Sequence, residues 1–263
     1  MCALAVCIDI TAGNRTMDIA FCEDGILQIS ALPGVESFCQ WVQQNAPRLV
    51  AIDAPSKRNC GRVALTRAQY GIPNNKYEDF RVVEAFLRLK GIGLYNTPLE
   101  DPPAWMNQGW QLYQSLEELG YQLLDEPGPT EISDDERVVI EVHPHASFVV
   151  GLGWIPQDKK GLAGQLERMA YLRTQCAEMG INVAGTCLAD DPLTSLQQIN
   201  ATWDGILVDG LKLPSISHDQ LDAVVGLTTV LRAANGQAFA VGDSADGVIV
   251  LPNNLAGIRY HRL

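Results

Sequence analysis

The first strand of the chain constrains the fold most, because it is apolar throughout except for one acidic residue. Residues 3–11 read ALAVCIDIT and are followed by the turn formers Gly13 and Asn14. An apolar run of this length, rich in Val and Ile and bounded by turn signals, is typical of a strand buried on both faces. Because an ionised carboxylate is costly there, Asp9 must meet a cation or hydrogen-bond donors.

Two later segments repeat this design of an apolar strand with an acid near its carboxyl end. Residues 49–54 read LVAIDA and residues 138–143 read VVIEVH. The acids that they carry are Asp53 and Glu141. Three strands of this kind in one chain predict an α/β fold whose acids gather at one edge of the sheet.

The order of elements predicts how the first strands pair. Alternating segments on both sides of the turn at residues 23–25 indicate a β-hairpin, so the first three strands should form an antiparallel meander. An amphipathic helix that opens at Pro33 then leads into the second acidic strand. Such a helix is the crossover that a parallel pair needs, and we therefore expect Asp9 and Asp53 to lie side by side.

The chain is long enough for one α/β domain spanning residues 1–263, with an inserted helical and loop region at about 56–136. We expect helices at 79–90 and 108–119 within the insertion. A lid over the site, a specificity element and a decoration of the fold are the alternatives for its role.

The second half of the chain predicts a helix at 162–179 and a second helix that opens at Ser217. Ser217 and the Gln three residues later form a capping-box pattern. Asp219 and Asp222 lie three residues apart and so share one face of this helix. A short hairpin at 239–251 is expected to follow.

Several carboxylates that converge without a cation repel one another, and a hard divalent cation such as Mg²⁺ or Mn²⁺ removes the repulsion. Two such ions about 4 Å apart can activate a water and stabilise the leaving oxygen of a phosphodiester. The bland alternative for each acid alone is a capping or salt-bridged residue. The candidate catalytic residues are Asp9, Asp53, Glu141, Asp219 and Asp222, and the candidate metal ligands are Asp9, Asp53, Glu141 and Asp222.

Charge is spread unevenly along the chain, whose net charge of −12 argues against a protein that coats nucleic acid non-specifically. Residues 57–90 are rich in Lys and Arg and begin with Lys57 and Arg58. Because they follow Asp53 closely, they could face an anionic substrate. A solvated helical surface is the alternative interpretation.

Three histidines lie beside candidate acids. In an extended segment, Glu141, His143 and His145 would point to one side, and Pro144 favours extension, which keeps a transition-metal site open as an alternative. His218 is a candidate general acid or base, or it covers a helix end. An ordinary hydrogen-bonded histidine near a strand end explains His143 equally simply.

Seven cysteines without a C-x-x-C pair are typical of a reducing cytoplasm and argue against a disulfide framework. The first apolar run has no basic region before it, ends in an acid and is interpreted as a core strand, not a signal peptide. The apolar runs are also too short to span a bilayer. We therefore expect a cytoplasmic protein without a membrane partner.

The order of the elements, with acids on the first and fourth strands and in the late helix, resembles the ribonuclease H-like superfamily. His218-Asp219-Gln-Leu-Asp222-Ala223 is similar to the D-x-x-D-A helix of the Holliday-junction resolvases in that superfamily. More closely, the chain resembles the DUF429 family of predicted nucleases. The pieces that carry this resemblance are Cys7-Ile-Asp9, Ala51-Ile-Asp53-Ala-Pro55, Arg81-Val-Val-Glu84, Glu141-Val-His-Pro144 and the late helix.

This resemblance implies a ribonuclease H-like mixed sheet, an antiparallel meander plus parallel strands, flanked by helices, with the insertion after the fourth strand. It implies a metal set of Asp9, Asp53, Glu141 and either Asp219 or Asp222, which lie in the motifs just quoted. Arg81 and Glu84 are implied as neighbours of the site.

The leading hypothesis is a Mg²⁺- or Mn²⁺-dependent phosphodiester hydrolase that acts on nucleic acid or a nucleotide. A phosphotransferase of the actin and sugar-kinase type is one alternative, although its first loop usually reads D-x-G-T and this chain has Thr11 and Gly13 after Asp9. A non-catalytic binding or regulatory module is the other. Its mark is a carboxylate cluster tied up by Arg or Lys.

Overall fold

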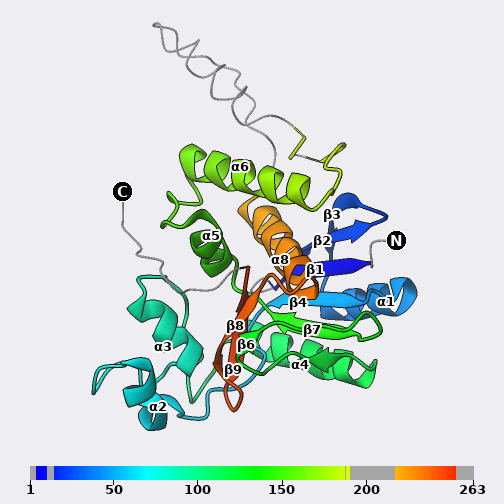
Figure 1. Cartoon of the computed structure of the whole chain (residues 1–263). Coiled ribbons are helices and arrows are strands. Elements are labelled where there is room, and N and C mark those ends of the chain that lie inside the picture. Colours follow the sequence, from blue (N-terminus) through cyan, green and yellow to red (C-terminus); the bar gives the residue numbers. More distant parts are fainter. Residues whose placement is uncertain (1–3, 11–14, 187, 190–216, 253–263) are drawn as a thin grey trace, which may run out of the picture.

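The computed structural model describes residues 4–10, 15–186, 188–189 and 217–252. Within this part, a six-stranded sheet with the strand order β3-β2-β1-β4-β7-β5 forms the centre of the molecule (Figure 1). Its strands are β1 (Ala5–Asp9), β2 (Met17–Glu23), β3 (Ile26–Leu32), β4 (Leu49–Asp53), β5 (Gln122–Leu123) and β7 (Val138–Glu141).

The strand directions confirm the predicted meander and the predicted parallel pair. β1 pairs antiparallel with β2, which pairs antiparallel with β3. On its other edge β1 pairs parallel with β4, and Asp9 and Asp53 are direct register partners. The remaining two strands, β7 and β5, are parallel to β4 as well. The sheet is therefore mixed, with its parallel half carrying the acids.

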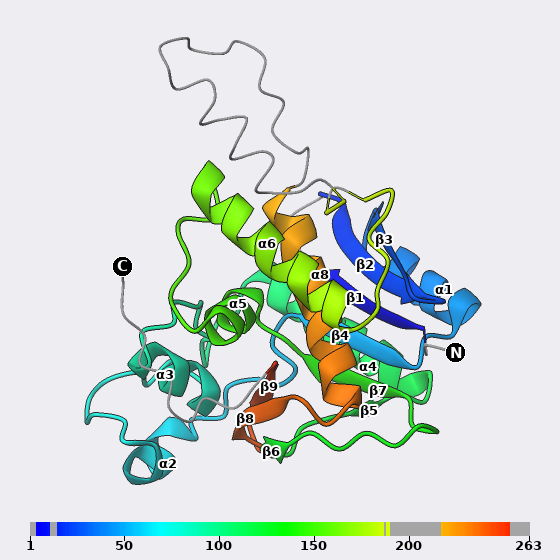
Figure 2. The ribbon, with the colours of Figure 1, turned by 45° about the horizontal axis from the view of Figure 1, so that its top comes forward.

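Helices cover both faces of this sheet. On one face α8, α5 and α6 pack over the strands, and on the other face α1 and α4 do so (Figures 1 and 2). The two hydrophobic clusters follow the strand alternation, because Ala5 and Cys7 belong to the first and Val6 and Ile8 to the second. The helices are α1 (Val35–Asn45), α2 (Val63–Tyr70), α3 (Val82–Leu89), α4 (Ala104–Glu118), α5 (Pro144–Leu152), α6 (Leu162–Glu178) and α8 (His218–Ala234).

Helix α8 lies directly on β1. A Cβ atom at Gly226 would come within 2.3 Å of Cys7 Sγ, so only glycine permits this approach. The predicted capping box is present: Ser217 Oγ accepts a hydrogen bond from Gln220 N at 3.0 Å, and Gln220 Oε1 accepts one from Ser217 N at 3.1 Å. The close packing and the cap together bring the first turns of α8 to the carboxyl end of β1.

A second, three-stranded sheet consists of β6 (Gly128–Pro129), β8 (Phe239–Asp243) and β9 (Gly247–Leu251). The hairpin of β8 and β9 was predicted, and an isolated bridge between Val142 and Val250 joins it to the end of β7. None of the described helices is long and apolar enough to cross a membrane.

The region between β4 and β7 forms part of the main α/β fold to a greater extent than its sequence indicated. β5 extends the main sheet, and α4 covers one of its faces. The expected helices at 79–90 and 108–119 are α3 and α4, and α2 was not predicted. Beyond this region, the structure contradicts the expected extension at Pro144, because this residue occupies the first turn of α5, where a fixed φ and a missing N–H are tolerated.

Candidate functional site

A cavity of about 720 Å³ lies where the carboxyl ends of β1, β4 and β7 meet the beginning of α8. Asp9, Asp53, Glu141, Asp219 and Asp222 all contribute to its lining. Ligands of open α/β sheets commonly bind at the carboxyl ends of parallel strands. The position and the lining together make this cavity the candidate site.

Three of these acids form a compact group, which we call the acid cluster. Ligand oxygens of Asp9, Asp219 and Asp222 all lie within 4.8 Å of one another. Asp9 and Asp222 are buried, with exposed fractions of 7% and 6%. One turn of α8 supplies the second and third members, which confirms that they share a face, and β1 supplies the first. The resemblance implied either Asp219 or Asp222 as a metal ligand, and both belong to this group.

The acid cluster carries more negative charge than its surroundings balance. Burial raises the pKa of Asp9 well above its usual value, and the neighbouring carboxylates of Asp53, Asp222 and Asp219 raise it further. Burial likewise raises the pKa of Asp222, although Lys159 partly opposes this. Oxygen donors that repel one another in a buried place fit a hard divalent cation such as Mg²⁺ or Mn²⁺.

Lys159 is the cation that meets the acid cluster. Its Nζ lies 2.9 Å from Asp222 Oδ2, and its side chain is still 42% exposed. Burial lowers the pKa of Lys159, but Asp222 more than compensates, so the net pKa is raised. Sequence reasoning missed this residue because it lies between α5 and α6, in a segment without a periodic pattern. A single ammonium group neutralises one of the three carboxylates.

Asp53 lies level with Asp9 in the sheet but pairs with a histidine. Its Oδ1 is 3.8 Å from His143 Nδ1, and His143 Nε2 lies 3.5 Å from the carbonyl oxygen of Gly93. Burial lowers the pKa of His143, and Asp53 outweighs this so that the net pKa is raised. Asp53 and His143 thus form a dyad at the edge of the acid cluster.

The transition-metal alternative with Glu141, His143 and His145 is not supported. Among the described residues, the group with the geometry to bind a metal ion is the acid cluster. His145 lies in α5, so the three side chains do not follow an extended strand. Burial lowers the pKa of His145 to about 4, which keeps it neutral. His218 Nε2 lies 3.1 Å from Asp219 Oδ1, beside the acid cluster.

Glu141 faces away from the acid cluster, contrary to its predicted role as a metal ligand. Its register partner in β4 is Ile52, one residue before Asp53. Because side chains alternate along a strand, this offset of one residue turns the carboxylate toward the face of α1 and α4. Arg81 meets it there with two hydrogen bonds, of 2.5 Å to Oε1 and 2.9 Å to Oε2, and Ser56 N adds a third of 2.7 Å.

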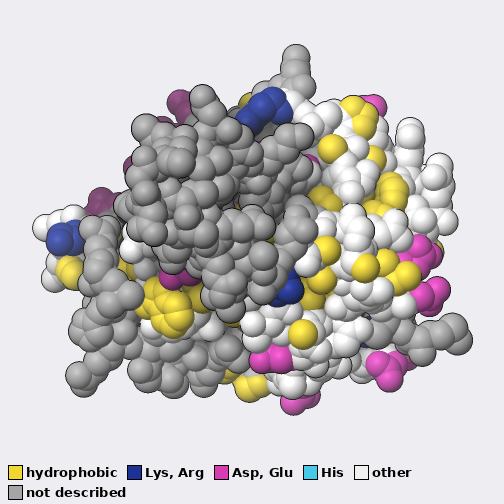
Figure 3. Space-filling view, turned by 90° about the horizontal axis from the view of Figure 1, so that it is seen from above, with side chains coloured by type: hydrophobic (Ala, Val, Ile, Leu, Met, Phe, Trp, Pro, Cys, Tyr) yellow, Lys and Arg dark blue, Asp and Glu magenta, His cyan; other side chains and the backbone are white. Residues whose placement is uncertain are grey.

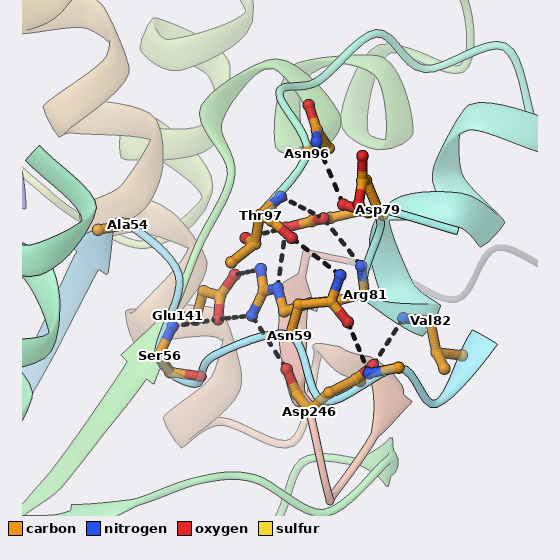
Figure 4. A network of polar contacts seen from close by, with 12 residues as sticks. Ala54, Ser56, Asn59, Asp79, Arg81, Val82, Asn96, Thr97, Glu141 and Asp246 are labelled. Carbon is orange, nitrogen blue, oxygen red and sulfur yellow. Dashed lines mark hydrogen bonds and ion pairs between the residues drawn. The ribbon is translucent and has the colours of Figure 1, made fainter. Parts of the chain in front are cut away.

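Arg81 is the centre of a buried ionic network (Figure 4). Besides Glu141 it binds Glu84, whose Oε1 lies 2.8 Å from Arg81 Nε. Glu84 also accepts hydrogen bonds from the backbone and the hydroxyl of Thr97. Burial lowers the pKa of Arg81, but the carboxylates of Glu141 and Glu84 outweigh burial, so the net pKa is raised. Arg81 and Glu84 both line the cavity, so they are neighbours of the site, as the resemblance implied.

The basic residues after β4 have partners within the protein. Lys57 Nζ binds Asp125 at 2.5 Å and the carbonyl oxygen of Ser244 at 2.6 Å. The guanidinium of Arg58 lies 3.9 Å from the centre of the Trp110 ring. Neither residue lines the cavity. The expected phosphate contacts of Lys57 and Arg58 therefore do not follow from their positions.

Asp246 is an unusual member of the network, because it is fully buried but only one of its two carboxylate oxygens has a hydrogen-bond partner. Its Oδ2 accepts a hydrogen bond of 3.0 Å from Val82 N, while Oδ1 has no partner among the described residues. Burial raises the pKa of Asp246 to about 7. Since the folded state holds this proton more tightly than the unfolded state, the contribution of Asp246 to stability is fully present at low pH and is lost as pH rises through about 7.

We expect Asp246→Asn to remove this loss, because asparagine keeps the bond from Val82 without a charge. The variant should be about 1–3 kcal/mol more stable than wild type at about pH 8 and equally stable near pH 4. Urea unfolding at both pH values measures this. Asp243→Asn is the control of opposite sign: burial raises the pKa of Asp243, but the hydrogen bonds from Arg62 and from the backbone of Ala245, together with the charge of Arg62, outweigh burial and lower it. Equal stability of Asp246→Asn and wild type at high pH would contradict the prediction.

Comparison with known proteins identifies the family. The model of the family described as "Protein of unknown function (DUF429)" matches residues 8–246, so the chain belongs to that family. No curated protein and no solved structure matched.

Proposed function

We propose that this DUF429 protein is a divalent-metal-dependent phosphodiester hydrolase with a ribonuclease H-like fold. The observation that carries the proposal is the acid cluster at the carboxyl end of β1, whose three carboxylates converge within 4.8 Å. Mg²⁺ and Mn²⁺ are the cations that such hard oxygen ligands favour. The proposed metal ligands are Asp9, Asp219 and Asp222.

The sheet supports the fold assignment. An antiparallel meander, a parallel strand beside β1 and acids at the ends of β1 and β4 are what the resemblance implied. The beginning of α8 brings two further acids to the same place. This combination of topology and acid positions is the basis of the proposed ribonuclease H-like fold.

The acid cluster, Asp53 and His143 have distinct roles in the proposed reaction. The acid cluster would hold the cation, which when bound would supply Lewis acidity toward a phosphoryl oxygen and lower the pKa of a water. Asp53 orients His143 through Nδ1, and His143 lines the cavity. His143 is therefore positioned to take a proton from the attacking water or to give one to the leaving oxygen.

A non-catalytic binding module is the second candidate, and two ion pairs favour it. Lys159 binds Asp222, and Arg81 binds Glu141. These are the cation-paired carboxylates expected of such a module. The sequence argument against the actin and sugar-kinase alternative was the departure from D-x-G-T at Thr11 and Gly13, which lie outside the described residues.

Hydrolysis of a generic aryl phosphodiester tests the proposal. The purified full-length protein is incubated with bis(p-nitrophenyl) phosphate and either Mn²⁺, Mg²⁺ or EDTA. We expect p-nitrophenolate release with Mn²⁺ and no release with EDTA. Absence of release with both cations, together with absence of cation binding in calorimetry, favours the binding module.

Removing the Lys159 ammonium is expected to raise the affinity for Mn²⁺. Lys159→Ala leaves Asp222 without its cation, so the metal-free protein should be less stable and the cation should stabilise it more than it stabilises wild type. We expect Mn²⁺ affinity to rise about tenfold, and the increase in melting temperature with Mn²⁺ measures it. Lys160→Ala is the matched control, because Lys160 does not line the cavity. A lower Mn²⁺ affinity in Lys159→Ala contradicts the prediction.

A further inference from the structure

We infer that the substrate of this site is a short nucleotide phosphodiester, of one or two nucleotide units, and not a long strand. The inference rests on the proposed function and adds a substrate class to it. Three features carry it: the size of the cavity, large apolar and aromatic side chains in its lining, and the scarcity of available cations around it.

The cavity has the size of a small-molecule site. Its volume of about 720 Å³ falls within the range of about 300–1,000 Å³ that is usual for small ligands. The acid cluster belongs to its lining. The lining also contains a group of large apolar side chains, which we call the aromatic wall: Leu94, Tyr95, Trp105 and Met106.

Tyr95 is the most informative member of this wall. Its exposed fraction is 81%, the highest among the exposed large hydrophobic residues of the described chain. An aromatic ring that borders a cavity without packing in the core is available to a ligand. Nucleobases stack on such rings irrespective of their sequence, because every base has a π face.

The segment that carries Tyr95 is fixed on both sides. Arg88 donates a hydrogen bond to the carbonyl oxygen of Leu94. Asn96 Nδ2 donates to the carbonyl oxygen of Asp79 at 3.1 Å, and Thr97 N donates to Glu84 at 2.8 Å (Figure 4). The backbone of this segment therefore needs no further ordering when a ligand binds, which lowers the entropic cost of binding.

Few cations around the cavity are available to phosphates. Among the described residues, Arg15 is the only Lys or Arg of the lining that has no hydrogen bond or ion pair. The remaining cations of the lining have partners within the protein: Arg81 binds Glu84 and Glu141, Arg88 binds the carbonyl of Leu94, Lys159 binds Asp222, and Arg168 binds the carbonyls of Gln157 and Gly164.

A polymer would need a continuous track of Lys and Arg side chains beyond the cavity. On the face seen in Figure 3, Lys and Arg side chains of the described residues appear as isolated spots. The net charge of −12 also repels a polyanion at long range. In the lining, Arg15 is available, and Lys159 becomes available where a cation displaces it from Asp222. These two groups are enough for one phosphodiester, with a base on the aromatic wall.

Salt dependence of binding tests the substrate length. The probes are a phosphorothioate-linked thymidine dinucleotide and a long thymidine oligonucleotide with the same linkages, each titrated with saturating Mn²⁺. Each phosphate contact to a single strand contributes a slope of about −0.7 in log affinity against log salt. We expect a slope of one to two contacts for both probes and equal affinity per linkage. A slope of about four contacts or more for the oligonucleotide, with far tighter binding per linkage, would overturn the inference.

Tyr95 variants test the aromatic wall. We expect Tyr95→Ala to weaken dinucleotide binding about tenfold and Tyr95→Phe to bind like wild type, because only the ring is needed. Leu65→Ala is the matched control, since Leu65 is 76% exposed and lies on α2 outside the cavity lining. Unchanged binding by Tyr95→Ala would overturn the inference.

The aryl phosphodiester assay separates the two proposals. If the wild-type protein hydrolyses bis(p-nitrophenyl) phosphate with Mn²⁺ but does not bind the dinucleotide, the substrate class is wrong and the hydrolase stands. If it binds no Mn²⁺, the hydrolase itself is wrong.

Discussion

Asp9→Asn is expected to abolish Mn²⁺-dependent hydrolysis while leaving the fold intact. Asp9 supplies a central ligand of the acid cluster, and an amide oxygen carries no charge for the cation. Since loss of a residue that merely supports a metal ligand already costs about 10–100-fold, we expect a loss of more than about 100-fold in kcat/KM. Steady-state kinetics with bis(p-nitrophenyl) phosphate measures it.

The same variant should be more stable than wild type when no cation is present. Burial and three neighbouring carboxylates raise the pKa of Asp9, so its charge is unfavourable in the metal-free fold and asparagine removes it. A higher melting temperature in EDTA, with no further increase on adding Mn²⁺, is the expected result. Asp125→Asn, outside the cavity, is the control. Unchanged turnover by Asp9→Asn contradicts the ligand assignment.

Arg81→Met is expected to have the largest effect on stability. It leaves the carboxylates of Glu84 and Glu141 buried without their cation, since the Arg81 side chain is 1% exposed and contacts both. Breaking a buried ion pair by removing one partner typically costs about 3–5 kcal/mol. Urea unfolding measures this. Arg81→Lys keeps the charge but loses the bidentate contact with Glu141, so its loss of stability should lie between those of wild type and Arg81→Met.

A surface ion pair provides the control for this prediction. Arg62 binds Asp243 at 3.0 Å, but its side chain is 36% exposed. Arg62→Met should therefore destabilise the protein much less than Arg81→Met, because exposed ion pairs contribute little to stability. Equal effects of the two Arg→Met changes would show that the buried network does not stabilise the fold as described.

Much of the main sheet could be predicted because its signals are local. The alternation around residues 23–25 predicted the meander, and the amphipathic stretch after Pro33 predicted the crossover that sets Asp9 beside Asp53. The capping box at Ser217 predicted where α8 begins. These features depend on neighbours in the sequence, which a single sequence displays.

The position of Glu141 could not be predicted, because it depends on register. The residues around it give the same strand pattern as those around Asp53. Only the pairing of Glu141 with Ile52 decides that its side chain points to the opposite face. Pro144 was ambiguous for a related reason, since proline fits both an extended segment and the first turn of a helix.

The contacts of Lys159 and Tyr95 were also beyond sequence reasoning. Both residues lie in segments without secondary structure, where no periodic pattern fixes the direction of a side chain. Tertiary contacts place them, Lys159 against Asp222 and the segment of Tyr95 against Arg88 and Glu84. The aromatic wall became visible only when the cavity lining was known.

Anomalous scattering from crystals soaked in Mn²⁺ tests the central claim most directly. We predict a peak bounded by Asp9, Asp219 and Asp222, with the Lys159 ammonium displaced from Asp222. Absence of a peak there at millimolar Mn²⁺, with Lys159 still on Asp222, would contradict the metal site and favour a non-catalytic binding module.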